Sequence, residues 1–356
     1  MSKITISLLI AFLGISCSSE SVEQTPTPAE NLYFPPLSGT TWETKSIASL
    51  GWKQDAVQPL LDYLELKHSR GFIILVNGRI VLENYFNGHT ATTNWYWASA
   101  GKTLTSTITG IAEQESLINI NNKVSDYIGT GWTSEPLAKE SLITCKNLLN
   151  MTSGLNDNTD DVTPASLQYT ADAGTRWAYH NVYVKLQDVV AQASGQPWSA
   201  YFNTKLRDKI GMDGAWFQSG NNSVYSSTTR SMARFGLLMF NKGKWENNII
   251  LNENYFNQAT NTSQNINLGY GYLWWLNGKT SYHLPQSQLQ FSGSLIPTAP
   301  NDMFIALGKN DQKIYVIPSK KMVVIRMGDV SDPANPTFAL SGFDAELWTK
   351  ISALYQ

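Results

Sequence analysis

Ser99 and Lys102 stand three residues apart at the start of a stretch with helical periodicity. The apolar residues from Leu104 to Ala112 recur at helical spacing, which predicts a helix with one buried face. Positions three apart share a helix face, so the hydroxyl and the amine should meet at the first turn. A serine nucleophile needs a nearby base, and a lysine whose pKa is lowered by burial can serve. The same spacing also fits a polar N-cap followed by a solvated lysine.

Two other segments accompany this pair. Tyr179-His180-Asn181 lies in the middle of the chain, and Phe304–Gly308 has the pattern of a short apolar strand that ends in glycine. A Ser-x-x-Lys helix, a Tyr-x-Asn loop and a glycine-bearing strand, in this order, resemble the serine β-lactamase and penicillin-binding-protein superfamily. The Tyr-x-Asn form is similar to the class C branch and its related esterases.

Further segments extend the resemblance from about residue 35 to residue 356. The stretch Ile143–Leu155 resembles the family's "LLxMTSGL" segment, and Ala173–Trp177 resembles its "PGxxW" approach to the tyrosine, with alanine in place of proline. Met232–Leu238 is similar to a helix of the same branch, and Tyr270–Trp275 is similar to its "YGYxWW" strand.

The resemblance implies a role for each motif residue. Ser99 would form an acyl-enzyme, and either Lys102 or Tyr179 would be the general base; the Lys102 ammonium would lower the pKa of Tyr179. Asn181 would orient Lys102 and donate a hydrogen bond to the substrate, while His180 should point away. Apart from the resemblance, Tyr179 also fits a core phenol, and Asn181 also fits a turn residue.

An oxyanion hole is implied at the end of the late strand. The resemblance places its donors at the backbone N–H groups of Ser99 and Lys309, and Gly308 would let the backbone approach the acyl group. Ala306 stands where the family usually has Lys or His, and Asp311 stands where glycine is expected. Without a cation at position 306, the site should favour uncharged esters or amides; Lys309 is either a substitute cation or a solvated lysine.

The predicted fold class is α+β. Asn77-Gly78 is a strong hairpin signal between the apolar runs 72–76 and 80–83. Three short β-rich runs follow late in the chain, at 303–307, 314–317 and 322–327, and a helix is expected at about 343–354. The early and late strands should form one antiparallel sheet flanked by helices. A mainly helical insertion is expected at about 103–270, with helices dominating 180–260 and breaks at Gly195 and 220–222. The two regions should meet at a cleft.

The N-terminus is predicted to be a targeting segment. Lys3 precedes an apolar run, Ile4–Ile15, that is too short to span a membrane. Residues 1–17 should be a signal whose Cys17 resembles a bacterial lipidation site, residues 18–36 a flexible tether, and residues 37–356 the hydrolase domain. We expect an exported protein, either periplasmic or anchored to the outer membrane by lipid; simple signal cleavage is the alternative.

Composition excludes several classes of function. The 356 residues carry a formal net charge of −2 and no basic run, so no nucleic-acid partner is expected. The four histidines lack ligand spacing, so neither metal nor cofactor is expected, and Cys145 should be a buried apolar residue. The sequence therefore predicts a serine hydrolase for small esters or amides. A peptidoglycan peptidase, a weak β-lactamase and a catalytically silent binding or sensor protein remain alternatives, and the oligomeric state is open.

Overall fold

The computed structural model describes residues 31–334 and 342–356. The predicted signal segment and Cys17 lie outside these residues, as does most of the predicted tether. The chain divides into two compact units, Met1–Asn31 and Leu32–Gln356, and the second unit contains the helices and strands described below. Within the described residues, no helix has the length and apolarity needed to cross a membrane.

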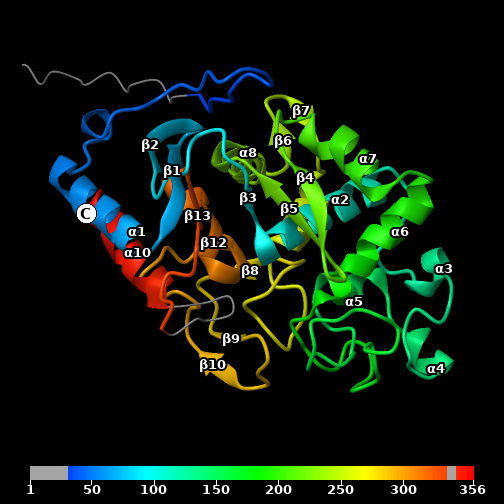
Figure 1. Ribbon diagram of the computed structural model, residues 1–356. Coiled ribbons are helices and arrows are strands. Elements are labelled where there is room, and N and C mark those ends of the chain that lie inside the picture. Colours follow the sequence, from blue (N-terminus) through cyan, green and yellow to red (C-terminus); the bar gives the residue numbers. More distant parts are fainter. Residues whose placement is uncertain (1–30, 335–341) are drawn as a thin grey trace, which may run out of the picture. The chain divides into compact units, whose positions relative to one another are not determined.

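A six-stranded antiparallel sheet forms the centre of the second unit, in the order β2-β1-β13-β12-β11-β8 (Figure 1). The strands are β1 (Ser69–Val76), β2 (Arg79–Tyr85), β8 (Trp275–Leu276), β11 (Phe304–Gly308), β12 (Gln312–Ile317) and β13 (Met322–Gly328). The early strand β1 pairs with the late strand β13, with Ile73 opposite Ile325. Asn77 and Gly78 both have positive φ, at 50° and 82°, as the tight turn between β1 and β2 requires. The predicted α+β sheet is confirmed.

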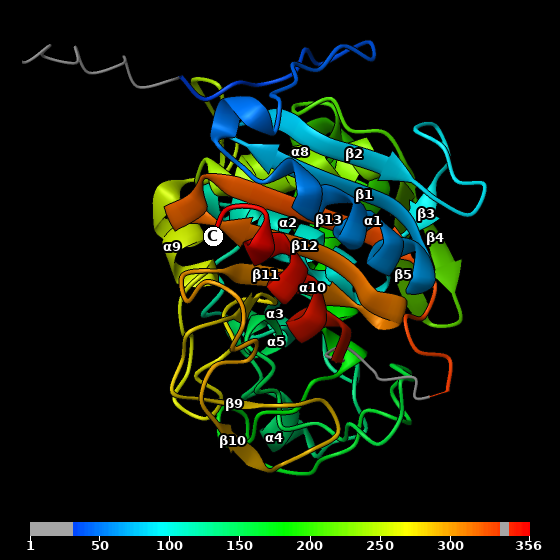
Figure 2. The same cartoon turned by 90° about the vertical axis from the view of Figure 1, so that its left-hand side faces the viewer.

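Helices cover both faces of this sheet. Helices α1 (Val57–Leu66) and α10 (Gly342–Ala353) contact each other on one face, which is turned toward the viewer in Figure 2. Helix α8 (Thr229–Phe240) packs against β1, β12 and β13 on the other face. Gly236 allows this close packing, because a Cβ there would lie 2.5 Å from Val323 Cγ1.

The region between β3 (Trp95–Tyr96) and β8 contains, besides α8, several helices joined by loops. They are α2 (Lys102–Gln114), α3 (Ser125–Ile128), α4 (Leu137–Glu140), α5 (Cys145–Leu149), α6 (Lys185–Ser194), α7 (Trp198–Phe202) and α9 (Glu253–Ala259). The long helix α2 is buried over most of its length and contacts α6 and α9. Cys145 is fully buried at the start of α5, as expected.

The prediction that helices dominate 180–260 is wrong for part of this region. Strands β4 (Ala215–Ser219) and β5 (Asn222–Ser227) form a hairpin that joins β3 in a three-stranded sheet. Gly220-Asn221, interpreted from the sequence as a helix break, is the two-residue turn of this hairpin. Alternate residues of β5 are buried, which is the periodicity of a strand.

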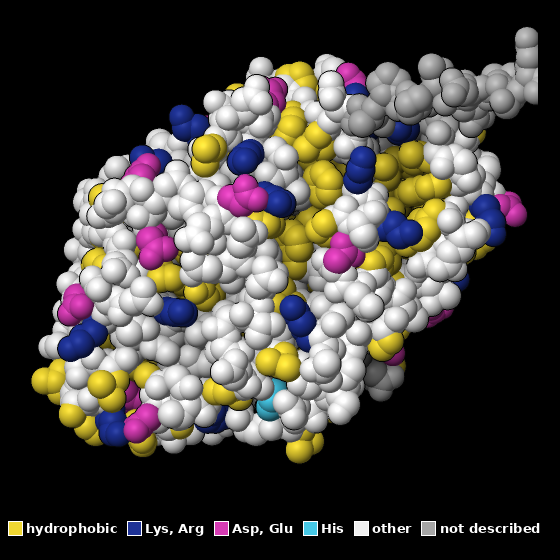
Figure 3. All heavy atoms as spheres, turned by 180° about the vertical axis from the view of Figure 1, so that it is seen from behind, with side chains coloured by type: hydrophobic (Ala, Val, Ile, Leu, Met, Phe, Trp, Pro, Cys, Tyr) yellow, Lys and Arg dark blue, Asp and Glu magenta, His cyan; other side chains and the backbone are white. Residues whose placement is uncertain are grey.

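Small hairpins complete the unit. They pair β6 (Lys244–Trp245) with β7 (Asn248–Ile249), and β9 (Ser281–His283) with β10 (Gln290–Ser292). On the face seen from behind, positive and negative side chains are scattered over the surface, and hydrophobic side chains are visible between them (Figure 3).

Candidate active site

Ser99 lies in a short 3-10 turn, Ala98–Gly101, that leads directly into helix α2. Lys102 is the first residue of α2, and its Nζ donates a hydrogen bond of 2.9 Å to Ser99 Oγ. Ala98, just before the serine, has a φ of 47°, a left-handed conformation that costs energy for a residue with a side chain. The predicted contact between hydroxyl and amine is therefore present, but it spans the 3-10 turn that precedes α2 and does not lie in the first turn of the α-helix itself.

The Lys102 side chain enters the protein interior and is only 2% exposed. Its Nζ also donates to Asn181 Oδ1 at 3.0 Å. Two aromatic rings lie near the same nitrogen: the ring centroids of Tyr179 and Tyr183 are 4.9 and 4.4 Å away. The amine is thus held by two oxygens and surrounded by apolar ring carbons.

Burial lowers the pKa of Lys102 from 10.5 to about 7, because an ammonium loses its hydration inside the protein. The Asp160 carboxylate opposes this fall, but its effect is the smaller of the two. A substantial fraction of Lys102 is therefore a neutral amine near pH 7, with a lone pair available to accept a proton.

Tyr179 lies against the same serine. Its side chain is hydrogen-bonded to Ser99, is 4% exposed, and packs against Trp177, Tyr270 and Trp275. Burial raises the pKa of Tyr179 above its ordinary value of 10.0. The expectation that Lys102 would lower this pKa is wrong, because desolvation of the phenolate dominates.

Asn181 contacts both Lys102 and the loop that carries Asp160. Its Oδ1 accepts from Lys102, while its Nδ2 lies 3.4 Å from both the backbone oxygen and Oδ1 of Asp160. Its neighbour His180 is buried, and Nε2 of that ring contacts the Thr159 backbone oxygen at 2.8 Å. Asn181 therefore contacts the amine directly, whereas the His180 ring contacts the Thr159 backbone; the catalytic roles assigned to these residues from the sequence stay predictions.

Strand β11 brings Gly308 and Lys309 to the serine turn. A Cβ on Gly308 would lie 2.5 Å from the Trp97 backbone oxygen and 3.0 Å from the Ala100 nitrogen. The glycine is thus required by the close approach of β11 to the turn that carries Ser99. The approach of Gly308 to a bound acyl group, which the resemblance implies, stays a prediction.

The residues after Lys309 adopt an unusual backbone. Asn310 and Asp311 have φ of 61° and 59°, the left-handed region that favours glycine. Hydrogen bonds hold them there: Arg326 donates to both of their backbone oxygens, at 2.7 and 3.1 Å, and Ser331 Oγ donates to the Asp311 carboxylate at 2.6 Å. This explains how an aspartate occupies a position where glycine was expected.

A pocket of about 430 Å³ opens onto Ser99. It is lined by Tyr96, Ala98, Ser99, Lys102, Asp160, Asn181, Tyr183, Phe217, Ser219, Asn222, Val224 and Lys309. Ala306 is 1% exposed and is not among these residues. Lys309, by contrast, is exposed and lines the pocket. The sequence alone does not show where this side chain lies.

Sequence reasoning missed one wall of this pocket. Four of its lining residues belong to the β4–β5 hairpin, including Phe217, which is 45% exposed, and Val224. The turn residue Asn221 donates to Asp161, which ties the hairpin to the loop that carries Asp160. The Gly220-Asn221 dipeptide was the available signal, because such pairs favour two-residue hairpin turns.

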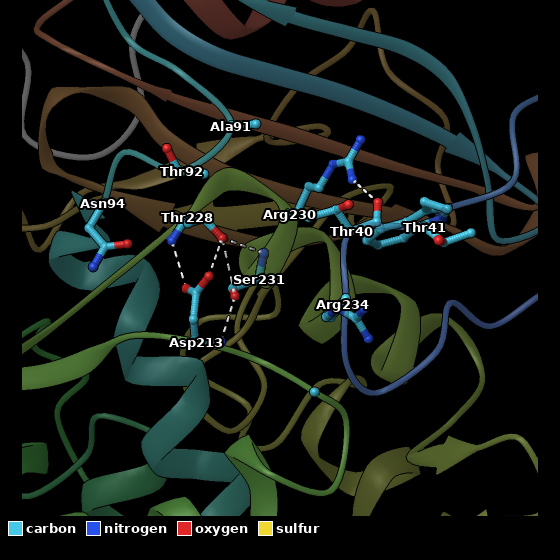
Figure 4. Close-up of a pocket in the computed structure, with 13 residues that line it drawn as sticks. Thr40, Thr41, Ala91, Thr92, Asn94, Asp213, Thr228, Arg230, Ser231 and Arg234 are labelled. Carbon is cyan, nitrogen blue, oxygen red and sulfur yellow. Dashed lines mark hydrogen bonds between the residues drawn. The ribbon is translucent and has the colours of Figure 1, made fainter.

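A second hollow, of about 490 Å³, has no lining residue in common with the Ser99 pocket (Figure 4). Its charged side chains already have partners within the protein. Arg230 pairs with Glu83, Arg234 donates to the backbone oxygens of Ile210 and Pro36, and Asp213 accepts from Thr228. These bonds join helix α8 to neighbouring segments, so the hollow has a structural explanation.

Metal ligation has no candidate in the part of the chain that the structure describes. No group of three or more His, Cys, Asp or Glu side chains there is placed to hold an ion. The chemistry available at Ser99 is that of a hydroxyl, an amine and a phenol in mutual contact.

Comparison with solved structures shows the same fold in several hydrolases. A putative 6-aminohexanoate-dimer hydrolase from Bacillus anthracis aligns with a TM-score of 0.68 and 18% identity, covering 91% of this chain and 89% of that one. A putative β-lactamase from Bacteroides dorei has a TM-score of 0.66 and 14% identity, covering 84% and 98%. EstCE1, a hydrolase with promiscuous acyltransferase activity, has a TM-score of 0.63 and 12% identity, covering 87% and 99%.

Comparison at the level of sequence identifies the family. A search of curated proteins gave no match. The family model described as Beta-lactamase matches residues 67–335, a span that includes the Ser99 turn, the Tyr179 loop and strand β11. With this match over most of its length, the chain belongs to the β-lactamase family.

Proposed function

We propose that this protein is a serine hydrolase that cleaves small ester or amide bonds through an acyl-enzyme on Ser99. Members of its fold family are generally serine hydrolases. The observation that carries the proposal is the 2.9 Å hydrogen bond between Ser99 Oγ and a buried lysine whose pKa is lowered to about 7. A solvated lysine after an N-cap would show neither the burial nor the lowered pKa.

The contacts support Lys102 as the general base. In its neutral form, the amine accepts the proton of Ser99 Oγ while the oxygen attacks the substrate carbonyl. Tyr179 is protonated in the resting site, because burial raises its pKa, and it hydrogen-bonds to Ser99. It gives this proton to the leaving group, and the proton that Lys102 took from Ser99 replaces it on Tyr179. Water then attacks the acyl-enzyme by the same route, which restores the free serine.

The negative oxygen of the tetrahedral intermediate needs donors. The backbone N–H groups of Ser99 and Lys309 are the proposed pair, because Gly308 holds β11 against the serine turn. The bonds from Arg326 to the Asn310 and Asp311 oxygens keep the segment after Lys309 in one conformation. Loss of one such donor typically costs about a hundredfold or more in rate.

The pocket supports small, uncharged substrates. Tyr96, Phe217 and Val224 provide apolar surface, and the buried Ala306 provides no charge for a substrate carboxylate. A β-lactamase or peptidase activity remains the second candidate, because Lys309 lines the pocket. The mutual contacts of Ser99, Lys102 and Tyr179 argue against a catalytically silent protein.

Substrate preference tests this proposal. We expect kcat/KM for a short-chain aryl ester to exceed that for any penicillin or cephalosporin by at least about tenfold, since a charge-assisted bond to the carboxylate, worth roughly 1.5–3 kcal/mol, is missing. Lys309→Ala should lower cephalosporin hydrolysis by no more than about fivefold, because exposed charges contribute little. Steady-state kinetics on both substrates measure this, with Lys209→Ala, an exposed lysine outside the pocket, as the control.

Two outcomes would contradict that expectation. A preference of the wild type for the cephalosporin would replace the esterase proposal with the β-lactam-directed one. A selective loss above tenfold in Lys309→Ala would show that Lys309 supplies the missing cation. A lysine introduced at position 306 is a poor test, because that position is 1% exposed and the charge would be buried.

We also propose that the protein is exported and lipid-anchored in a bacterial envelope. The support is the apolar run Ile4–Ile15 followed by Cys17. Mass spectrometry of the mature N-terminus from the native host should find a diacylated Cys17. An unmodified N-terminus beyond position 17 would contradict lipidation and leave export standing.

A further inference from the structure

Tyr183 is a residue of the site to which no role has been assigned so far. It lies two residues after Asn181, in the short 3-10 helix Asn181–Val184, and is 4% exposed. Its ring centroid is 4.4 Å from Lys102 Nζ, closer than that of Tyr179, and it lines the Ser99 pocket. Lys102 lines the same pocket, so the Tyr183 ring lies beside the amine at the edge of the space that pocket water can enter.

We propose that Tyr183 is a positioning residue whose ring covers the Lys102 amine and keeps pocket water from it, so that the amine can accept the Ser99 proton. This inference rests on the proposed function, because it concerns the base of the same reaction. It assigns the effect to the ring of Tyr183. The hydroxyl has no assigned part, since no hydrogen bond between it and Lys102 occurs among the described contacts.

An aromatic ring near an ammonium has two opposing effects. Its π face attracts the cation, which favours the protonated form, and its bulk excludes water, which disfavours that form. Lys102 has a lowered pKa in spite of two rings within 5 Å, and burial is the largest cause. The proposal requires the exclusion of water by the Tyr183 ring to outweigh its attraction for the cation.

Other charged and titratable groups near the amine also affect the pKa of Lys102. The Asp160 carboxylate favours the ammonium, and it is the charge that acts on Lys102 against burial. Tyr179, Tyr183 and His180 stay neutral near pH 7, because burial raises the pKa of both phenols and lowers that of the imidazole. Lys309 lines the pocket as a further positive charge.

The test is the pH dependence of kcat/KM for a neutral aryl ester. Wild type should lose activity as the pH falls through about 7. Tyr183→Phe keeps the ring and should shift this midpoint by less than about 0.3 pH units. Tyr183→Ser opens the space to water and should raise the midpoint by at least about one pH unit, a tenfold loss at acidic pH that is recovered at alkaline pH.

Matched variants keep the inference falsifiable. Tyr183→Val, apolar but too short to cover the amine, should show the same upward shift if the serine variant does not fold. Asp160→Asn should move the midpoint down, because it removes the charge that favours the ammonium. The rate at which a fluorophosphonate labels Ser99 at each pH gives a second readout for every variant.

Two results would overturn the inference: a folded Tyr183→Ser or Tyr183→Val variant with the wild-type midpoint, or a Tyr183→Phe variant that shifts as far as they do. The second result would assign the effect to the hydroxyl. Failure of the proposed function is distinguishable, because the wild type itself would then show neither ester hydrolysis nor labelling.

Discussion

Replacing Ser99 with alanine is expected to reduce ester hydrolysis by at least about a thousandfold and to abolish fluorophosphonate labelling. The oxygen that attacks the carbonyl is Ser99 Oγ, which accepts a hydrogen bond of 2.9 Å from Lys102 Nζ. The fold should remain intact, since the change removes one small, partly exposed side chain. Hydrolysis rates, probe labelling and thermal unfolding measure the three effects.

Ser106 provides the matched control for this variant. It lies on the same helix α2, is 1% exposed, and is not among the residues that line the Ser99 pocket. Ser106→Ala should keep wild-type activity and labelling, because it removes a hydroxyl that lies outside the Ser99 pocket. Labelling of Ser99→Ala at the wild-type level would contradict the assignment of the nucleophile.

Replacing Lys102 with methionine should reduce activity by at least about a thousandfold and, at the same time, stabilise the fold. The unfolded chain keeps this lysine protonated up to about pH 10.5, whereas the folded chain releases the proton near pH 7. The lysine therefore lowers stability most below pH 7, by roughly 5 kcal/mol, and this cost disappears as the pH rises toward 10.

Methionine removes this cost but also loses the hydrogen bonds to Ser99 and Asn181. We expect a net gain of roughly 2–4 kcal/mol in the free energy of unfolding at pH 6, and no gain at pH 10. Denaturant unfolding at both pH values measures this. A methionine variant that is less stable than wild type at pH 6, or that retains activity, would contradict the account of Lys102 as a buried base.

Several features were predictable because they depend on local sequence. The Asn77-Gly78 turn and the apolar runs beside it specify the β1–β2 hairpin, and the late runs specify β11, β12 and β13. The spacing of Ser99 and Lys102 predicts their contact, because helical geometry alone brings positions three apart together. These elements follow from periodicity and turn chemistry.

Other features depend on contacts between distant segments. Asp160 and Tyr183 carry no motif of their own, and the fold alone brings them to the lysine. The pKa of Tyr179 was predicted in the wrong direction, because the sequence shows a nearby lysine and does not show how completely the phenol is buried. Position 308 likewise requires glycine because the backbone oxygen of Trp97, more than two hundred residues earlier in the chain, leaves no space for a side chain there.

The hairpin β4–β5 shows a different kind of error. Its signal, Gly220-Asn221, is local, but it lies between helical segments and was interpreted as their break. Because the hairpin was not predicted, the pocket wall that contains Phe217 and Val224 was not predicted either. That wall is part of the surface that would contact a substrate.

The central claim, an acyl-enzyme on Ser99, is tested most directly by mass spectrometry of protein quenched in acid during turnover of an aryl ester. We expect a mass increase equal to one acyl group, located by peptide mapping on Ser99, lost in Ser99→Ala and retained in Ser106→Ala. Turnover with the acyl group on a different residue, or adducts of equal amount in Ser99→Ala, would contradict the claim.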